Sequence, residues 1–385
     1  MGQNKQDDSM QMFQAHYDTL RRQLGEVLAN STVQYEGNLK VHSGSSTTYQ
    51  GIWPDDFLYP VIIDPSLLEP DMRASVVEYL TECCIDLDHV PDRVEGRGRA
   101  VMQPGALSAP HALHMPLHLP AAWVRLLDYM EQLGTPIPHK SEWASLLERS
   151  FAQVPFSCGL AYVDPQWPYV GFGFHDPCAI TGWELMSSVV LHRGLLRAAR
   201  MFDGIASPAV LQRWQRLAAG VRANLHRLYD EQAGAYLAGS VDCRQVDVWG
   251  NGLAYWLSDE PQRRRIVAWY KANRDRIFLH GCTRQVAEEG GWLRQLVPVP
   301  VGNYTNGGFW PTGTGFVLAA IADQDPAFAL DLVGDLVDAL EPLAFSEWID
   351  AAGMPHGAQW FTAALSVPLL ALKSILEAKP FLDYL

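Results

Sequence analysis

Hydrophobic residues along this 385-residue chain recur mainly three and four positions apart, which is the repeat of an amphipathic helix. Between 181 and 203 the repeat is carried by Leu185, Val189, Leu191, Leu195, Leu196 and Ala199. The same pattern predicts helices over 9–29, 71–84, 121–134, 140–155, 181–203, 207–231, 247–257, 260–279, 313–323, 326–341 and 358–377. The alternation typical of strands is scarce, so the pattern indicates an all-α protein.

Local signals support several of these boundaries. Ser207 followed by Pro208 is typical of a helix start, and the stretch "DQDPAFALDL" predicts another start of the same kind. Two segments favour extended structure instead. Residues 33–41 are consistent with a hairpin around Gly37-Asn38, and 297–301 with a short extended piece.

Loops rich in Gly, Pro and aromatic residues separate the helices, about six times at intervals of about 50–70 residues. Most of them lead into an apolar helix, and each interval is long enough for one helix out and one back. Six such hairpins predict an (α/α)6 barrel with few short strands, in one domain over 1–385; the alternative is an irregular helical solenoid. All six loops would then gather around a pocket at one end. The loops are 49–57, 110–120, 171–182, 242–251, 303–315 and 346–357.

The composition of the chain indicates which classes of molecule it can bind. A formal net charge of −14 argues against nucleic acid and against anionic membrane surfaces. The 13 tryptophans suit a carbohydrate, whose apolar faces stack on indole rings. The first residues lack an apolar signal core, no apolar run reaches 18 residues, and the six cysteines form no CxxC. We therefore expect a cytoplasmic protein that acts on a carbohydrate without a cofactor.

The predicted loops carry carboxylates that suit the cleavage of a glycosidic bond. That reaction uses two carboxyl groups on opposite faces of the scissile bond, about 6.5–9.5 Å apart in inverting enzymes. Glu347 is the first candidate, because Phe345 and Trp348 flank it and an aromatic surround raises the pKa of a carboxyl group. The loop acids are Asp55, Asp56, Asp176, Asp247, Glu347 and Asp350.

The stretch "FSEWIDAAGMPHGAQWFTAAL" resembles the last-loop motif of the glucoamylase family. The matching residues are Ser346, Glu347, Asp350, Gly353, Trp360, Ala363 and Ala364. The resemblance implies that Glu347 is the general base that activates water. A Glu before an aromatic-rich last inner helix is also similar to the processing α-glucosidase and mannosylglycerate hydrolase family. Both families belong to the six-hairpin glycosidases, which are inverting enzymes on (α/α)6 barrels.

The first loop supports this resemblance. "GIWPDDF" resembles a W-x-R-D element whose Asp holds sugar hydroxyl groups, which assigns that role to Asp56 and the aromatic role to Trp53. Asp55 departs from the family pattern, which has Arg there. The alternative for Asp55 and Asp56 is to cap a helix.

Two carboxylates near the third loop are candidates for the general acid. The family places it shortly before a helix that resembles "MSSVVLHRGLL", but the family's Trp-Glu-Glu segment is missing here. Asp176 is the nearest carboxylate and our first choice, with a turn before Pro177 as the alternative. Glu184 competes with it, although we expect Glu184 to lie inside the helix 181–203.

Other loop residues complete the predicted site. We expect sugar contacts from Trp53, Asp55, Asp56, His175, Asp247, Asn306, Trp310, Trp348, His356 and Trp360. The histidines at 111, 114 and 118 have helical spacing, but prolines at 110, 116 and 120 exclude a regular helix there, so we expect no metal site.

These observations predict an inverting glycoside hydrolase for a small or oligomeric neutral glycoside, with Asp176 as acid and Glu347 as base. The resemblance alone favours an α linkage. A sugar 2-epimerase or lyase on the same barrel is one alternative, because His175 and His356 lie next to the predicted catalytic loops. A carbohydrate-binding barrel without catalysis is the other.

Overall fold

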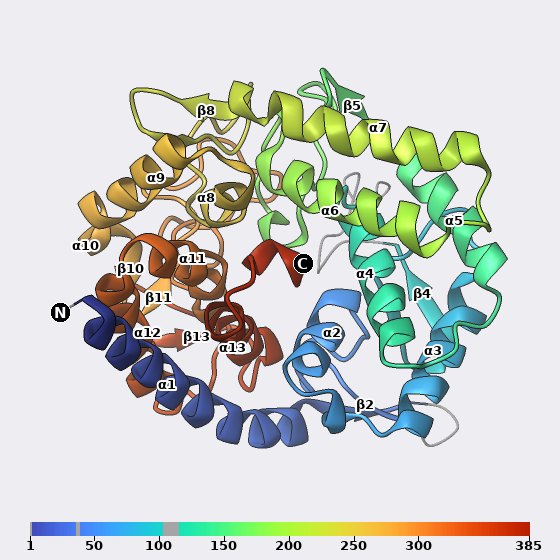
Figure 1. The fold of residues 1–385 in the computed structure, drawn as a ribbon, viewed down its shortest axis with the longest axis horizontal. Helices are drawn as coiled ribbons and strands as arrows, with labels where there is room; N and C mark the ends of the chain where they lie inside the picture. The colour runs from blue at the N-terminus through green and yellow to red at the C-terminus, as the bar shows by residue number, and fades with distance from the viewer. Residues whose placement is uncertain (1, 36–38, 103–114) are drawn as a thin grey trace.

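The computed structural model describes residues 2–35, 39–102 and 115–385. Over these ranges, inner and outer helices alternate along the chain in two concentric rings (Figure 1). Each inner helix contacts the next, and the last contacts the first, so the ring is closed. The inner ring comprises α2 (Pro54–Ile63), α4 (Leu119–Gln132), α6 (Leu185–Met201), α8 (Val248–Ala254), α11 (Pro311–Gln324) and α13 (Thr362–Leu376). The outer ring comprises α1 (Gly2–Ser31), α3 (Pro70–Cys84), α5 (Lys140–Gln153), α7 (Pro208–Asn224), α9 (Glu260–Ala272) and α12 (Pro326–Leu340), with the short α10 (Arg274–Ile277) after α9. The predicted (α/α)6 barrel is confirmed.

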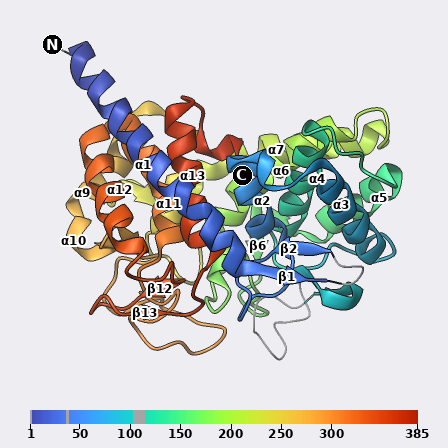
Figure 2. The ribbon, with the colours of Figure 1, turned by 90° about the horizontal axis from the view of Figure 1, so that it is seen from below.

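The connections differ at the two ends of the barrel. Those from an outer to an inner helix are long and hold every strand of the described residues, whereas those from an inner to an outer helix are short. The long connections gather at one end, the lower edge of Figure 2. Five of the six predicted loops lie in them or run from them into an inner helix; of the sixth, 110–120, residues 110–114 lie outside the described residues and 115–120 lead into α4. Their antiparallel pairs are β1 (Thr32–Gln34) with β2 (Lys40–His42), β3 (Arg93–Glu95) with β4 (Arg99–Val101), β8 (Tyr229–Asp230) with β9 (Ala235–Tyr236), β10 (Phe278–Leu279) with β11 (Cys282–Thr283) and β12 (Trp348–Ile349) with β13 (Pro355–His356); β5 (Phe156–Ser157), β6 (Leu160–Val163) and β7 (Gly182–Trp183) form one sheet.

Of the two segments predicted to be extended, one forms strands in the structure and the other does not. The predicted hairpin at 33–41 is confirmed by the pairing of Thr32 with His42, while its Gly37-Asn38 turn lies outside the described residues. The predicted extended piece at 297–301 is wrong, because these residues form no strand. Pro298 and Pro300 lack the N–H groups that a ladder requires.

Helix starts follow their capping residues. The Ser207 side chain accepts a hydrogen bond from the Val210 N–H, and Asp325 accepts one from the Phe328 N–H at 3.1 Å, each with a proline at the first helical position. Both predicted starts are confirmed.

The helical periodicity in the sequence did not predict α2. The reason is that inner helices are buried on nearly all sides. Nine of the ten residues of α2 are buried, so its sequence shows no polar face, and Pro60 lies inside it. Elsewhere glycine allows inner helices to approach closely. A Cβ atom on Gly252 would lie 2.2 Å from the Phe316 carbonyl oxygen, and one on Gly315 would lie 2.4 Å from the Val367 carbonyl carbon. In the described part of the chain, no helix combines the length and apolar character needed to cross a membrane.

Candidate active site

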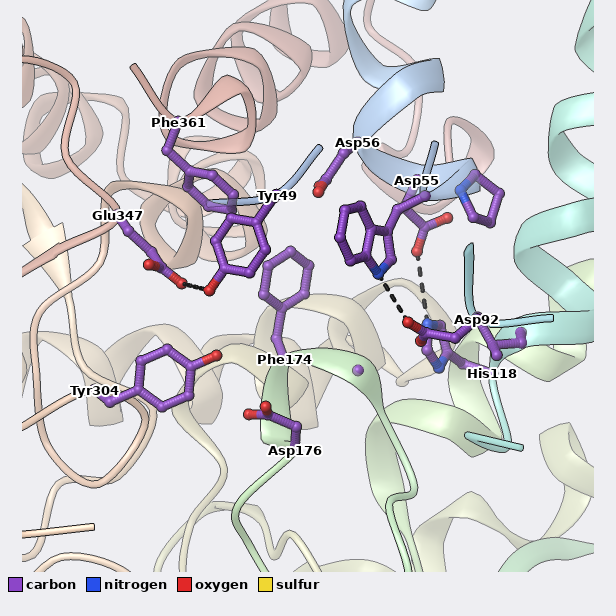
Figure 3. A pocket seen from close by; sticks show the side chains of 14 residues that line it. Tyr49, Asp55, Asp56, Asp92, His118, Phe174, Asp176, Tyr304, Glu347 and Phe361 are labelled. Carbon is purple, nitrogen blue, oxygen red and sulfur yellow. Dashed lines mark hydrogen bonds and ion pairs between the residues drawn. The ribbon is translucent and has the colours of Figure 1, made fainter. Parts of the chain in front are cut away.

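A cavity of about 90 Å³ opens among the long connections at the mouth of the barrel (Figure 3). Five of the six predicted loops contribute to its lining. Carboxyl and aromatic side chains make up most of its walls, which is the composition of a sugar-binding site. The lining residues are Tyr49, Trp53, Pro54, Asp55, Asp56, Asp92, His118, Leu119, Gly173, Phe174, Asp176, Tyr304, Glu347 and Phe361.

Glu347 lies immediately before β12 with its side chain only 3% exposed. The Tyr49 hydroxyl donates a hydrogen bond of 2.7 Å to Oε1, and the Ala358 N–H donates one of 2.9 Å to Oε2. Burial raises the pKa of Glu347 to about 7, and these two hydrogen bonds oppose the rise. Both favour the ionised form, so this carboxylate is held ready to accept a proton.

Asp176 follows a single 3-10 turn, Gly173–His175, and is 8% exposed. No described residue donates a hydrogen bond to its Oδ1 atom. Burial is the main cause that raises the pKa of Asp176 to about 8, the charge of Glu347 adds to it, and a hydrogen bond from Tyr304 opposes it. A protonated Asp176 is therefore favoured at neutral pH.

The two carboxyl groups lie on different walls of the same cavity, and the hydroxyl groups of Tyr49 and Tyr304 lie between them (Figure 3). Their environments differ, since Glu347 accepts two hydrogen bonds while Asp176 Oδ1 accepts none. Such a difference separates a proton donor from a proton acceptor. The arrangement can deliver one proton to a bound molecule and remove another.

The first loop adds three more predicted residues to this cavity. The Trp53 Nε1–H donates a hydrogen bond of 2.9 Å to Asp92 Oδ2, which fixes the indole ring. Burial, and then the charges of Asp55, Glu347 and Asp92, raise the pKa of Asp56 to about 8. Within the described residues the Asp56 carboxyl group has no hydrogen-bonding partner, so it is free to bind a ligand hydroxyl group.

Asp55 replaces the Arg of the family pattern, and the structure provides a cation beside it. Arg125 of α4 forms an ion pair with Asp55, and His118 Nε2 lies 3.7 Å from the same carboxylate. Asp55 is therefore paired with a cation of the second inner helix.

The remaining predicted sugar contacts lie outside the lining of this cavity, where they have other partners. His175 and Asp247 are buried and do not line it, with 4.0 Å between His175 Nε2 and Asp247 Oδ1. Asp247 caps α8 through the Gly250 N–H, and Asn306 accepts a hydrogen bond from the Trp292 N–H.

The aromatic candidates and His356 pack among the loops. Trp310 is 1% exposed and donates a hydrogen bond to the Tyr304 carbonyl oxygen. Trp348 stacks on His356, with 4.5 Å between ring centroids, and Trp360 packs on Phe345. These contacts stabilise the walls that hold the cavity residues in place.

We expected Glu184 to lie inside the helix, and this prediction is wrong. Glu184 instead caps the start of α6. Its side chain accepts hydrogen bonds from the N–H groups of Met186 and Ser187, and it is fully buried outside the cavity lining. Asp176 is thus the carboxyl group that the third loop brings to the cavity.

Searches with protein-family models and against curated proteins find no match for this chain. Solved structures do match its fold. A GH63 mannosylglycerate hydrolase from Thermus thermophilus, in complex with glucose, has a TM-score of 0.62 at 13% identity, covering 91% of this chain and 99% of that one. A rhamnosidase from Klebsiella oxytoca has a TM-score of 0.61 at 14% identity, covering 93% and 64%. A glucoamylase from Saccharomycopsis fibuligera has 0.58 at 11%, covering 95% and 96%.

This chain has a six-hairpin glycosidase-like fold. These structural neighbours are glycoside hydrolases, and the match extends over most of the chain.

Several cavity residues of this glycosidase-like fold were not predicted from the sequence. Tyr49 and Tyr304 belong to two of the predicted loops. Their position as polar residues at a loop edge was the one sign in the sequence that they could line the cavity. Asp92 comes from the connection before β3, outside the six predicted loops, and nothing local marks it. The others are Pro54, His118, Leu119, Gly173, Phe174 and Phe361.

The described residues contain no group of three or more His, Cys, Asp or Glu side chains arranged to hold a metal ion. His111 and His114 lie outside the described residues, and His118 faces Asp55 and Arg125 instead.

Proposed function

We propose that this protein is an inverting glycoside hydrolase that acts on a neutral carbohydrate, with Asp176 as general acid and Glu347 as general base. The observation that carries the proposal is the pair of carboxyl groups on different walls of one cavity, one hydrogen-bonded and the other with a free oxygen. The glycosidase-like fold supports it.

In the proposed reaction, protonated Asp176 donates its proton to the glycosidic oxygen as the bond to the anomeric carbon breaks. Glu347 removes a proton from a water molecule, whose oxygen attacks that carbon from the opposite face. The product sugar gains the hydroxyl group with inverted configuration, and the leaving group departs as an alcohol. A proton exchange with solvent returns both carboxyl groups to their starting states.

The walls of the cavity suit one sugar ring. Trp53, Phe174 and Phe361 offer apolar faces, while Asp56 offers a carboxyl group to hydroxyl groups. A larger recess of about 1070 Å³ shares Tyr49 and Trp53 with the cavity. We assign it to the rest of the substrate.

Proton abstraction from carbon, as in an epimerase or lyase, would call for a histidine at the ligand. His175 is buried and His356 pairs with Asp350, and neither lines the cavity. In the described part of the lining, only His118 is a histidine, and it lies against Asp55. No observation therefore favours that alternative.

The proposal is tested with a panel of aryl α- and β-glycosides of glucose, mannose and rhamnose. We expect phenol release by the native protein, with the first-formed sugar anomer inverted in proton NMR. Glu347→Gln should lower kcat by about 10²–10⁴-fold while folding normally. Asp350→Asn, in the same loop but outside the cavity, is the matched control and should stay active. Full activity of Glu347→Gln would overturn the assignment of the base.

A further inference from the structure

The end of the barrel opposite the catalytic cavity is closed by the last residues of the chain. The chain end lies within the inner ring (Figure 1), and its 3-10 turn, Phe381–Asp383, contacts α6, α11 and α13. The Tyr384 carbonyl oxygen accepts a hydrogen bond of 3.3 Å from Arg125, and the Asp383 carbonyl oxygen accepts one from Arg197. The Tyr384 hydroxyl donates to Glu377 at 2.6 Å. This C-terminal plug, residues 380–385, is thus held by polar contacts as well as by the burial of Phe381, Leu382 and Leu385 in the hydrophobic core.

A second cavity of about 440 Å³ borders this plug. Its volume lies in the range of small-molecule sites. Its three arginines, Arg193, Arg197 and Arg200, follow the spacing of one face of α6. The lining is Ile62, Asp128, Tyr129, Gln132, Arg193, Arg197, Arg200, Lys373, Glu377, Lys379, Asp383 and Tyr384.

The lining holds more positive than negative charge. It contains five cations and three carboxylates, an excess of two positive charges. The carboxylates are already engaged, Asp128 by Arg200 at 2.5 Å, Asp383 by Arg193 at 2.6 Å, and Glu377 by Lys373 and Lys379 at 2.9 and 2.7 Å. Four cations therefore share three carboxylates, and the fifth has none.

The fifth cation is Arg197. It is partly buried, and its only hydrogen bond to a described residue goes to the neutral carbonyl oxygen of Asp383. Burial and the neighbouring guanidinium groups of Arg125, Arg193 and Arg200 lower the pKa of Arg197 to about 9, while Asp128 opposes the shift. The buried Nε–H of Arg193 also lacks a partner among the described residues. Unpaired guanidinium donors next to a cavity are costly unless an anion binds them.

We propose that this cavity is a binding site for a small dianion, such as phosphate or a dicarboxylate, held by Arg197 and Arg193 with the excess charge of the lining. Two arginines one turn apart present planar donors that match the oxygens of either group. A dianion would balance the excess of two charges. It would also secure the C-terminal plug, because Arg197 and Arg193 both bind Asp383. The inference is independent of the proposed hydrolase activity.

The test is thermal unfolding of the full chain in sodium phosphate, sodium succinate or sodium chloride at equal ionic strength. We expect a melting temperature that rises with phosphate or succinate, saturates, and exceeds the effect of chloride. Comparing phosphate with succinate shows which dianion the site prefers. Arg197→Gln should weaken the apparent affinity by about tenfold or more, as expected for the loss of a charge-assisted hydrogen bond. Arg216→Gln, an exposed arginine of α7, is the matched control and should leave the response unchanged.

If Arg197→Gln folds poorly, the double variant Arg200→Gln/Lys379→Gln replaces it. Both side chains are mostly exposed, so their loss removes charge from the lining with little cost to packing. It should also reduce the affinity by about tenfold. A response to phosphate and succinate that equals that to chloride, or one that persists in these variants, would overturn the proposal.

Discussion

The Tyr49 hydroxyl donates a hydrogen bond of 2.7 Å to Glu347 Oε1, and thereby joins the first and last loops of the barrel across its mouth. The two residues are 298 positions apart in the sequence. Tyr49 also interacts with Tyr304, which in turn contacts Asp176. The proposed acid and base are therefore connected through two phenols.

Replacing Tyr49 by Phe should shift the acidic limb of the pH–activity profile. Glu347, with a pKa raised to about 7, must be ionised to accept a proton, and Asp176, with a pKa raised to about 8, must be protonated to donate one. Activity should therefore rise towards pH 7 and fall above pH 8. Tyr49→Phe removes a hydrogen bond that lowers the pKa of Glu347, so the acidic side should shift to higher pH.

The measurement is kcat/KM against pH, with a loss of about 10–100-fold at the optimum for Tyr49→Phe. Tyr270→Phe provides the control, because it also loses a buried hydroxyl hydrogen bond, to the Val248 carbonyl oxygen, and Tyr270 lines neither the cavity nor the larger recess. If the acidic limb of the pH–activity profile lies at the same pH in the native protein, in Tyr49→Phe and in the control variant, the role of Tyr49 is contradicted.

Leaving groups should distinguish the proposed acid from its competitor. Asp176→Asn cannot protonate the departing oxygen, so it should lose most activity on aryl glycosides whose phenols have a high pKa and least on those with a low pKa. Glu184→Gln keeps an acceptor at the start of α6 and should lower activity equally for all leaving groups, if at all. The slope of log kcat against the pKa of the phenol is the measurement. A steeper slope in Glu184→Gln than in Asp176→Asn would reverse the assignment.

A single methyl group beside Glu347 should strongly lower activity. Gly357 has a φ of 73°, and a Cβ atom there would lie 2.2 Å from Glu347 Oε2, so Gly357→Ala must displace this carboxylate. Gly353→Ala is a matched control with a φ of 77°, where the nearest atom is the flexible His280 Nε2 at 3.1 Å. Both variants should lose about 1 kcal/mol of stability through the left-handed backbone.

Only Gly357→Ala should also lose activity, by at least about 100-fold if the base is displaced. The comparison uses kcat/KM together with the urea midpoint of each variant. Equal activity in the two variants would show that the position of Glu347 is not critical.

The buried Asp247 should make the protein less stable at alkaline pH. Burial raises the pKa of Asp247 from its ordinary value of 3.8 to about 8, so the folded state keeps a proton that the unfolded state releases. The free energy of unfolding should then fall between about pH 4 and pH 8, by about 1.4 kcal/mol per pH unit for this group. Asp247→Asn cannot ionise and should lose stability less steeply.

Urea unfolding at pH 5 and pH 8 measures this difference. Asp203→Asn removes an exposed carboxylate and should leave the pH dependence of stability unchanged. If Asp247→Asn and the native protein lose equal stability between the two pH values, the carboxyl group is already ionised in the folded state.

The sequence determined the architecture of this protein because periodicity and capping are local. Six intervals between aromatic-rich loops predicted six helical hairpins, and closing them into a ring placed the loops at one end. Glu347 was found through its aromatic neighbours and its loop motif, and Asp56 through the first loop. Helix prediction failed where the local signals were weak. It missed α2, because this helix is buried on nearly every side and so has no polar face to give a periodic pattern.

Only the tertiary structure decided which loop residues meet. Asp176 and Glu347 are 171 positions apart in the sequence. The distance between their side chains is set by the packing of the inner helices, and the spacing of residues in the sequence does not reveal that packing. For the same reason Asp247, Asn306 and Trp310, which have the composition expected of sugar contacts, lie in the walls instead. A loop residue can point into the cavity or into the wall with the same neighbours in sequence, and the barrel determines which.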